Sequence, residues 1–174
     1  DICAIAKGLG AGYQPIGAML CSAKIHDTIQ HGSGFFQHGH TYLGHPVACA
    51  AALAVLERLI DDNVLAHVTP LGQALDAALK DRFGQHPHVG DIRGVGLFRA
   101  IELVQSRETK APFAPTDRLH AKLKAAAFEA GLICYPMGGT VDGEQGDHVL
   151  LAPPFVLQEA EVDQLVDRLE IALR

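Results

Sequence analysis

Segments with the patterns of strands and of helices alternate along this chain. Short apolar runs at residues 2–6 and 16–21 are typical of strands, and an alanine-rich segment over residues 46–60 predicts a helix that Pro46 begins. The polar run Asp61-Asp62-Asn63 is expected to end that helix. Interleaved strands and helices of this kind indicate an α/β or α+β fold.

The rest of the chain continues the alternation. Between the first strands and the first helix, residues 22–44 are irregular and rich in glycine and histidine, so we expect mostly loop there. Beyond Asn63 the pattern predicts a helix over residues 64–83, which Pro70 kinks or restarts, and then a strand signal within 92–103 that ends at residues 100–104. A helix over 117–130, which Gly131 stops, is followed by short strands at 132–135 and 148–151. The final helix has apolar residues at helical spacing: Val162, Leu165, Val166, Leu169, Ala172 and Leu173.

Length, charge and cysteine content limit the class of protein. The 174 residues suffice for one domain, or for one small domain and part of another. A net charge of -6 argues against nucleic acid or an anionic membrane as the main partner, and no apolar run reaches the ~18–20 residues that a membrane span needs. Four cysteines stand far apart without a Cys-x-x-Cys pair, which favours a reduced, cytoplasmic chain.

Lys7 follows the first apolar run directly and precedes three glycines, Gly8, Gly10 and Gly12. An amine in an apolar cleft can become a nucleophile toward a carbonyl carbon, and nearby glycines let a ligand approach the backbone. A lysine at a strand end that reaches into water is the alternative, and spacing alone leaves both open. Two nucleotide motifs are excluded: the third glycine of a Gly-x-Gly-x-x-Gly motif is replaced by Tyr13, and a P-loop lysine would follow its glycines.

The same segment resembles a known family. Residues 6–18 (Ala-Lys-Gly-Leu-Gly-Ala-Gly-Tyr-Gln-Pro-Ile-Gly-Ala) are similar to the cofactor-lysine signature of the class III aminotransferases, which use pyridoxal 5'-phosphate and have fold type I. Residues 40–50 resemble the second landmark of that family, and residues 93–97 and 152–155 match later ones in the same order. The resemblance covers essentially the whole chain.

The resemblance implies roles for two residues. Lys7 would form the Schiff base with pyridoxal phosphate and then move the α-proton of the substrate. Thr41 would bind the cofactor phosphate of a neighbouring subunit, which implies a homodimer with a shared active site; without the resemblance, Thr41 would be taken as a turn residue that caps the following helix. Residues 1–60 would be the end of the large cofactor-binding domain with its exit helix, and residues 61–174 the small C-terminal α/β domain.

The expected function is therefore a transaminase that moves an amino group from an amine or ω-amino acid to a keto acid such as pyruvate or 2-oxoglutarate. A PLP-dependent aminomutase, racemase or decarboxylase would share the same lysine, so Lys7 does not distinguish them. A truncated, non-catalytic module for dimerisation or binding is the third hypothesis. We expect no metal site, because the histidines between His31 and His45 lack ligand spacing and have no carboxylate among them.

The sequence departs from the family at two points. Relatives that clamp a substrate carboxylate often carry an arginine in the segment corresponding to residues 133–138, where this chain has Tyr135, and no arginine occurs between Arg118 and Arg168. A tyrosine offers one hydrogen bond where a guanidinium offers two. In the family, other cofactor-binding residues precede the lysine, and this chain begins six residues before Lys7. We therefore expect the isolated chain to be inactive. Arg93 and Glu102 are interpreted as structural charges.

Overall fold

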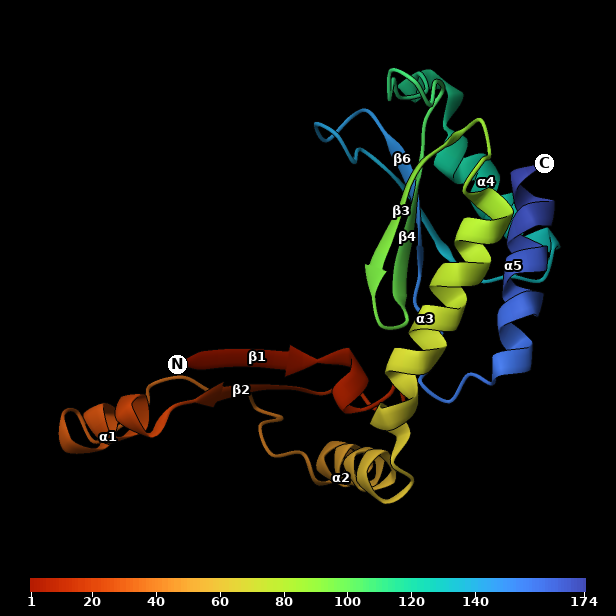
Figure 1. Cartoon of the computed structure of the whole chain (residues 1–174). Helices are drawn as coiled ribbons and strands as arrows, with labels where there is room; N and C mark the ends of the chain where they lie inside the picture. Colours follow the sequence, from red (N-terminus) through yellow and green to blue (C-terminus); the bar gives the residue numbers. More distant parts are fainter. The chain divides into compact units, whose positions relative to one another are not determined.

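The computed structural model describes all residues, 1–174, which divide into two compact units, Asp1–Asn63 and Val64–Arg174 (Figure 1). Each unit has its own antiparallel sheet. The mixture of helices and sheets agrees with the alternating pattern and with the expected α/β class. None of the helices combines the length and the apolar character that crossing a membrane requires.

The first unit is built on a two-stranded ribbon. Strands β1 (Ile2–Ala6) and β2 (Gly17–Cys21) pair antiparallel, with Ala6 opposite Gly17, as the two apolar runs predicted. Helix α2 (Pro46–Asp61) begins with proline in its first turn and ends at Asp62, again as predicted. Almost nothing in this unit is buried: the buried residues are Gly10, Ala48 and Ala52. The ribbon and helices therefore exist without a hydrophobic core of their own.

The expectation of mostly loop over residues 22–44 is wrong for its first third. Helix α1 (Ala23–His31) lies there, with Ser22 at its N-cap position and Gly32 following its last residue. Ser before a helix and Gly after it are standard boundary signals, and Ile25 and Ile29 lie one turn apart between them. None of its residues is buried, so no buried apolar stripe marks it in the sequence.

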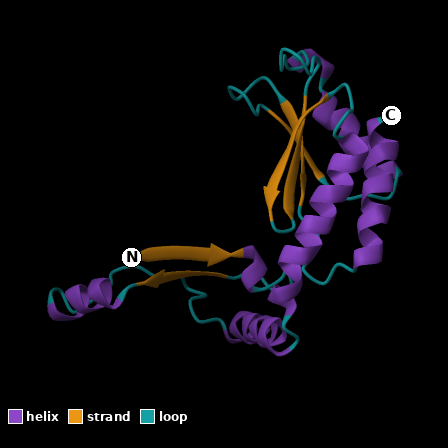
Figure 2. Cartoon of the chain, viewed as in Figure 1, coloured by secondary structure: helices purple, strands orange, loops and turns teal.

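The second unit has two layers. A four-stranded antiparallel sheet has the strand order β3–β4–β6–β5, and its members are β3 (Val89–Val95), β4 (Phe98–Leu103), β5 (Tyr135–Gly138) and β6 (Asp147–Leu151). Helices α3 (Val64–Phe83), α4 (Leu119–Glu129) and α5 (Glu159–Leu173) cover one face of it (Figure 2). The core between the layers consists of Leu75, Leu79, Phe83, Val89, Leu97, Ile101, Leu103, Leu123, Val149, Leu151, Val162, Val166 and Leu169.

The three predicted helices of this unit are confirmed, and α3 continues through Pro70. Two strand predictions need correction. The signal over residues 92–103 is a hairpin of two strands, β3 and β4, because Gly96 has a φ of 55° and turns the chain between them. The short strand expected at residues 132–135 is instead β5, which begins at Tyr135. Pro136 is tolerated within it because β5 is an edge strand of the sheet.

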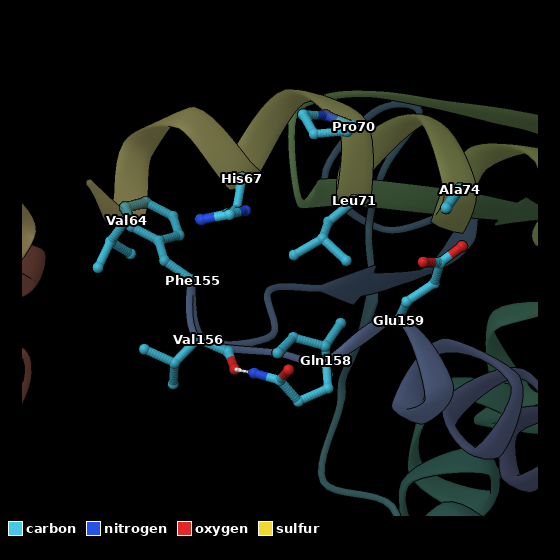
Figure 3. A pocket seen from close by; sticks show the side chains of 10 residues that line it. Val64, His67, Pro70, Leu71, Ala74, Phe155, Val156, Gln158 and Glu159 are labelled. Carbon is cyan, nitrogen blue, oxygen red and sulfur yellow. Dashed lines mark hydrogen bonds between the residues drawn. The ribbon is translucent and has the colours of Figure 1, made fainter. Parts of the chain in front are cut away.

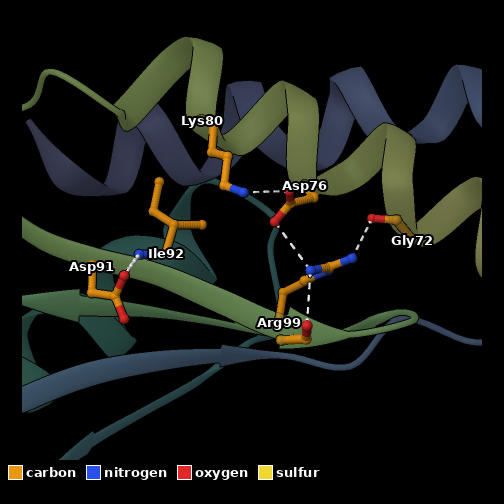
Figure 4. A network of polar contacts seen from close by, with 7 residues as sticks. Gly72, Asp76, Lys80, Asp91, Ile92 and Arg99 are labelled. Carbon is orange, nitrogen blue, oxygen red and sulfur yellow. Dashed lines mark hydrogen bonds and ion pairs between the residues drawn. The ribbon is translucent and has the colours of Figure 1, made fainter.

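A buried arginine joins α3 to the β3–β4 hairpin (Figure 4). Arg99 Nη1 donates to Asp76 Oδ1 at 3.0 Å and to the Gly94 carbonyl at 3.1 Å, and Nη2 donates to the Gly72 carbonyl at 2.8 Å. Its Nε atom is buried without a partner. Lys80 shares the Asp76 carboxylate, with its Nζ 2.6 Å from Oδ2. A buried guanidinium needs such partners because an unpaired buried charge is costly.

Candidate functional site

Lys7 stands at the end of β1, where the chain leaves the ribbon. It begins the short 3-10 helix η1 (Lys7–Leu9), and its φ of 51° is in the left-handed region that residues with a Cβ rarely adopt. This conformation costs about 1–2 kcal/mol. Its side chain is exposed. A strained backbone at a lysine marks a position where function, rather than stability, can account for the residue.

The turn after Lys7 is held by hydrogen bonds and close packing. The Gly10 amide donates to the Lys7 carbonyl at 3.1 Å, and the Ala11 amide donates to the Gly8 carbonyl at 3.2 Å. A Cβ on Gly10 would lie 2.8 Å from Ile16 Cγ2, so only glycine fits there. A Cβ on Gly8 or on Gly12 would meet no atom within 4 Å. The turn therefore fixes the backbone of Lys7 while open space lies along it, and α2 packs against η1 from within the same unit.

Thr41 lies in the exposed turn that precedes α2. The turn is closed by the Leu43 amide, which donates to the His40 carbonyl at 2.9 Å, and by the His45 amide, which donates to the Tyr42 carbonyl at 3.0 Å. The helix cap is His45, whose Nδ1 accepts from the Ala48 amide at 3.3 Å. Thr41 does not cap the helix, and its hydroxyl makes no hydrogen bond within the chain. It is free to bind an anion.

Lys7 and Thr41 lie on different loops of the first unit, and no hydrogen bond joins them. The histidine-rich segment near Thr41 forms edge-to-face ring contacts, such as the one between His38 and His40 with centroids 5.7 Å apart. No group of three or more His, Cys, Asp and Glu side chains is placed to hold a metal ion. All four cysteines are unpaired.

Tyr135 is the first residue of β5 and is exposed, with no side-chain hydrogen bond. The sheet register places Tyr135 opposite Leu150, Leu150 opposite Ala100, and Ala100 opposite Arg93. Because directly paired residues share a face, these four side chains form one row across the sheet. The neighbouring residues along the strands, Ile101, Val149 and Leu151, point to the other face and lie in the core under the helices. The row therefore lies on the face opposite the helices.

Arg93 is held by two carboxylates. Its Nη1 donates to Asp91 Oδ2 at 2.8 Å and to Glu102 Oε2 at 2.6 Å. These hydrogen bonds, first the one to Asp91 and then the one to Glu102, raise the pKa of the guanidinium. The pairing expected for Arg93 is present, and Glu102 is one of its partners.

Two histidine contacts were not predicted from the sequence. His120 Nδ1 lies 2.9 Å from Oδ1 of the buried Asp147, which also accepts from the His120 amide at 3.1 Å. Asp147 thus caps α4, because Arg118 at the N-cap position makes no side-chain cap. The partners are 27 residues apart, so no local pattern could reveal the pair.

The second histidine is on the open face. His148 Nδ1 and Thr140 Oγ1 lie 2.5 Å apart, and His148 is paired with Glu102 across the β4–β6 ladder. Burial lowers the pKa of His148, the charge of Arg93 lowers it further, and the carboxylates of Glu102 and Asp147 oppose this. The surroundings of His148 therefore favour its neutral imidazole.

A hollow lies elsewhere in the second unit (Figure 3). A cavity of about 450 Å³ lies between the first half of α3 and the segment that leads into α5. It is lined mainly by apolar side chains, with His67, Gln158 and Glu159 at its border (Figure 3). Neither Lys7 nor Thr41 belongs to its lining.

Comparison with known proteins gives consistent matches. Residues 1–173 match the family Aminotransferase class-III. A protein of Gibberella zeae named as an aminotransferase is 40% identical over 174 residues, which are 99% of this chain and 34% of that protein.

Solved structures of transaminases are also similar to this chain. A transaminase from the marine bacterium Virgibacillus is 34% identical with a TM-score of 0.91, over 99% of this chain and 38% of that one. An amine transaminase from an uncultivated Pseudomonas species, in its PLP-bound internal aldimine form, is 35% identical with a TM-score of 0.86, over 99% of this chain and 38% of that one. The chain thus spans about a third of the length of these relatives.

Proposed function

Because the chain belongs to the class III aminotransferase family, we propose that the protein it forms transfers an amino group from an amine or ω-amino acid to a keto acid. The observation that carries this proposal is the Lys7 turn: a primary amine held in a strained, glycine-flanked backbone with open space beside it. Neither a solvated surface lysine nor a nucleotide-binding loop requires that arrangement.

The family implies pyridoxal phosphate as cofactor, and the residues present fit it. Lys7 offers an exposed amine, and Thr41 offers a hydroxyl without a partner. When bound, the cofactor supplies the electron sink that transamination needs. Lys7 Nζ would hold the cofactor covalently and would carry the α-proton between carbon atoms of the substrate and cofactor. The fixed backbone at Lys7 limits where that amine can reach, which is what a proton carrier needs.

We further propose that Thr41 binds the cofactor phosphate of a second subunit, so that the active protein is a homodimer. Its backbone amide and hydroxyl are suitable phosphate donors in an exposed turn. In the same proposal the first unit belongs to the large cofactor-binding domain, and the second is the small C-terminal domain. The cytoplasmic location inferred from the cysteines remains a prediction.

Product analysis tests the function. The protein that this chain forms, incubated with an amine donor and pyruvate, should form alanine, whereas an aminomutase, racemase or decarboxylase would make no new amino acid from the acceptor. Lys7→Ala should lower the rate by at least about 10²-fold, because the amine that moves the proton is lost. Lys24→Ala is the matched control: Lys24 is an exposed lysine of α1, and its loss should leave the rate unchanged. Equal rates for Lys7→Ala and the unchanged protein would contradict the proposal.

A further inference from the structure

A second hollow of the second unit, of about 460 Å³, lies between the loop that follows α4, the end of β6 and one side of α5. We call it the α5 hollow. Most of its lining is apolar, with Leu132 and Ile133 from the loop, Leu151 and Pro154 from the strand end, and Leu157 and Leu165 from before and on the helix. Ile133 is 87% exposed, so part of this apolar surface is open. A hollow of this size with an apolar lining is typical of sites for small molecules.

Three polar side chains of the α5 hollow stand on α5 itself: Glu161, Gln164 and Arg168. Gln164 and Arg168 are one helical turn apart, so they lie on the same side of the helix. Glu161 is seven residues before Arg168, about 10 Å along the helix axis. Its Oε2 accepts a hydrogen bond from the Gln158 amide at 2.8 Å, as part of the capping box of α5. The only carboxylate of the lining is therefore engaged at one end of the hollow, and the only cation stands at the other end.

The guanidinium of Arg168 is held in place by the chain itself. Its Nη1 donates to the Gly131 carbonyl at 2.5 Å. Gly131 has a φ of 77° and follows α4 in a turn in which the Leu132 amide donates to the Ala127 carbonyl at 2.8 Å. A Cβ on Gly131 would lie 2.9 Å from Nη1, so the glycine permits this approach. One of the five N–H donors of Arg168 is used in this way, and the others have no partner within the chain.

Arg168 also lacks an acidic partner. Arg82 and Arg99 of the same unit each lie within 3.0 Å of a carboxylate oxygen, whereas Arg168 forms no ion pair. Arg107 and Arg118 are unpaired too, but neither lines the α5 hollow. A guanidinium binds a carboxylate through two parallel hydrogen bonds. A free guanidinium beside an apolar wall is therefore suited to an anion that carries an apolar body.

We propose that the α5 hollow is a binding site for a small carboxylic acid with an aliphatic body. The carboxylate pairs with the Arg168 guanidinium and accepts a hydrogen bond from the Gln164 amide, while the aliphatic chain lies on the leucine side chains of the lining. A protein partner would need a contact of about 800 Å² on each side, whereas the α5 hollow has the size of a small-molecule site. Every lining residue belongs to the second unit, so this inference does not depend on Lys7, on Thr41 or on the proposed function.

Equilibrium dialysis of the protein that this chain forms, with radiolabelled octanoate, tests the proposal. Octan-1-ol has the same chain without the charge, and acetate has the same charge without the chain. We expect saturable binding of octanoate that is at least about tenfold tighter than binding of octan-1-ol, because the alcohol makes no charge-assisted hydrogen bonds. Octanoate should also bind at least about tenfold tighter than acetate, which buries no chain. No saturation up to about 10 mM octanoate, or equal affinities for octanoate and octan-1-ol, would overturn the proposal.

A matched pair of arginine variants locates the site. Arg168→Gln should weaken octanoate binding by at least about tenfold and leave octan-1-ol binding unchanged. Arg118→Gln is the control, since Arg118 is also exposed and unpaired but precedes the first residue of α4, at the end of that helix away from Gly131. It should bind octanoate as the unchanged protein does. Equal losses of octanoate affinity in the two variants would overturn the proposal.

A second pair of variants decides the matter even if Arg168→Gln fails to fold. Ile133→Glu adds a carboxylate to the lining at a residue that is 87% exposed, and it should weaken octanoate binding at least about threefold by repulsion between like charges. Val95→Glu adds the same charge to the β3–β4 hairpin, outside the α5 hollow, at a residue that is 86% exposed, and it should have no effect. Unchanged octanoate affinity in Ile133→Glu would contradict the proposed site.

Discussion

At Gly72 the backbone of α3 touches the turn between β3 and β4. A Cβ on Gly72 would lie 2.4 Å from the Gly96 carbonyl oxygen, and the Gly72 carbonyl accepts the hydrogen bond from Arg99. In an open helix, replacing glycine with alanine stabilises by about 1 kcal/mol. Here the neighbouring atom is the backbone carbonyl oxygen of Gly96, which cannot rotate away. Replacing Gly72 with alanine should therefore destabilise the helix instead of stabilising it.

We expect Gly72→Ala to lower the free energy of unfolding of residues 64–174 by about 1–3 kcal/mol, the usual cost of overpacking. Urea denaturation measures this. Gln73→Ala changes the next, exposed residue of the same helix and should stay within about 0.5 kcal/mol of the unchanged protein. A Gly72→Ala variant more stable than the parent would show that the close approach is absent in solution.

Two histidines of the second unit make its stability depend on pH. Burial lowers the pKa of His148 and of His86 from the ordinary value of 6.5, and the charges of Arg93 and His88 respectively add to the effect. The unfolded chain therefore binds protons at a higher pH than the folded one. The resulting stability is present above pH 6.5 and falls as pH drops from there toward the lowered pKa values.

The free energy of unfolding measured in urea should thus decrease between about pH 7 and pH 5. In His148→Gln the decrease should be smaller, because only His86 then contributes. His26→Gln is the control, since His26 is exposed on α1 in the other unit. A decrease of the same size in all three proteins would disprove the role of His148.

Local sequence patterns predicted correctly those helices and strands whose boundaries depend on neighbouring residues in the chain. The boundaries of α2 follow from Pro46 and from the polar run at its end, and the ribbon follows from its two apolar runs. Helix α1 escaped prediction because none of its residues is buried, which leaves no buried stripe to mark it. The start of β5 was misplaced by three residues, because the apolar residues after Gly131 fit a strand pattern whether or not they pair.

In the candidate site, too, features that depend on neighbouring residues in sequence were predicted, and contacts between distant residues were not. Lys7 stood out because its glycines and preceding strand are contiguous in sequence, and the resemblance to the family implied its role, but its left-handed backbone could not be foreseen. The Asp147 cap of α4 and the carboxylates around Arg93 depend on sheet register, which brings residues from different strands together. Register is fixed by the packing of the whole sheet, so such contacts lie beyond a reading of local pattern.

At the scale of the molecule, the two units differ in how they are stabilised. The second has thirteen residues in one buried cluster, whereas the first buries Gly10, Ala48 and Ala52 alone. Burial of apolar surface is the main source of folding free energy, at about 25 cal/mol per Å². The apolar ribbon and α2 therefore need surfaces from other polypeptide, which is also why we propose that the isolated chain lacks activity.

A fragment of residues 64–174 should unfold cooperatively in urea, with the circular dichroism of a mixed helix and sheet protein. A fragment of residues 1–63 should show little regular structure and no cooperative transition, because ordering costs about 1–2 kcal/mol per residue without a core to offset it. A sigmoidal transition in the shorter fragment would contradict this division of stability.

The central claim is that Lys7 carries the cofactor. Borohydride reduction of the protein with bound pyridoxal phosphate, followed by digestion and mass spectrometry, is the test of this claim. Our account predicts the reduced cofactor on the peptide that contains Lys7, and on neither Lys24 nor Lys110. Modification of another lysine, with Lys7 unchanged, would contradict the account.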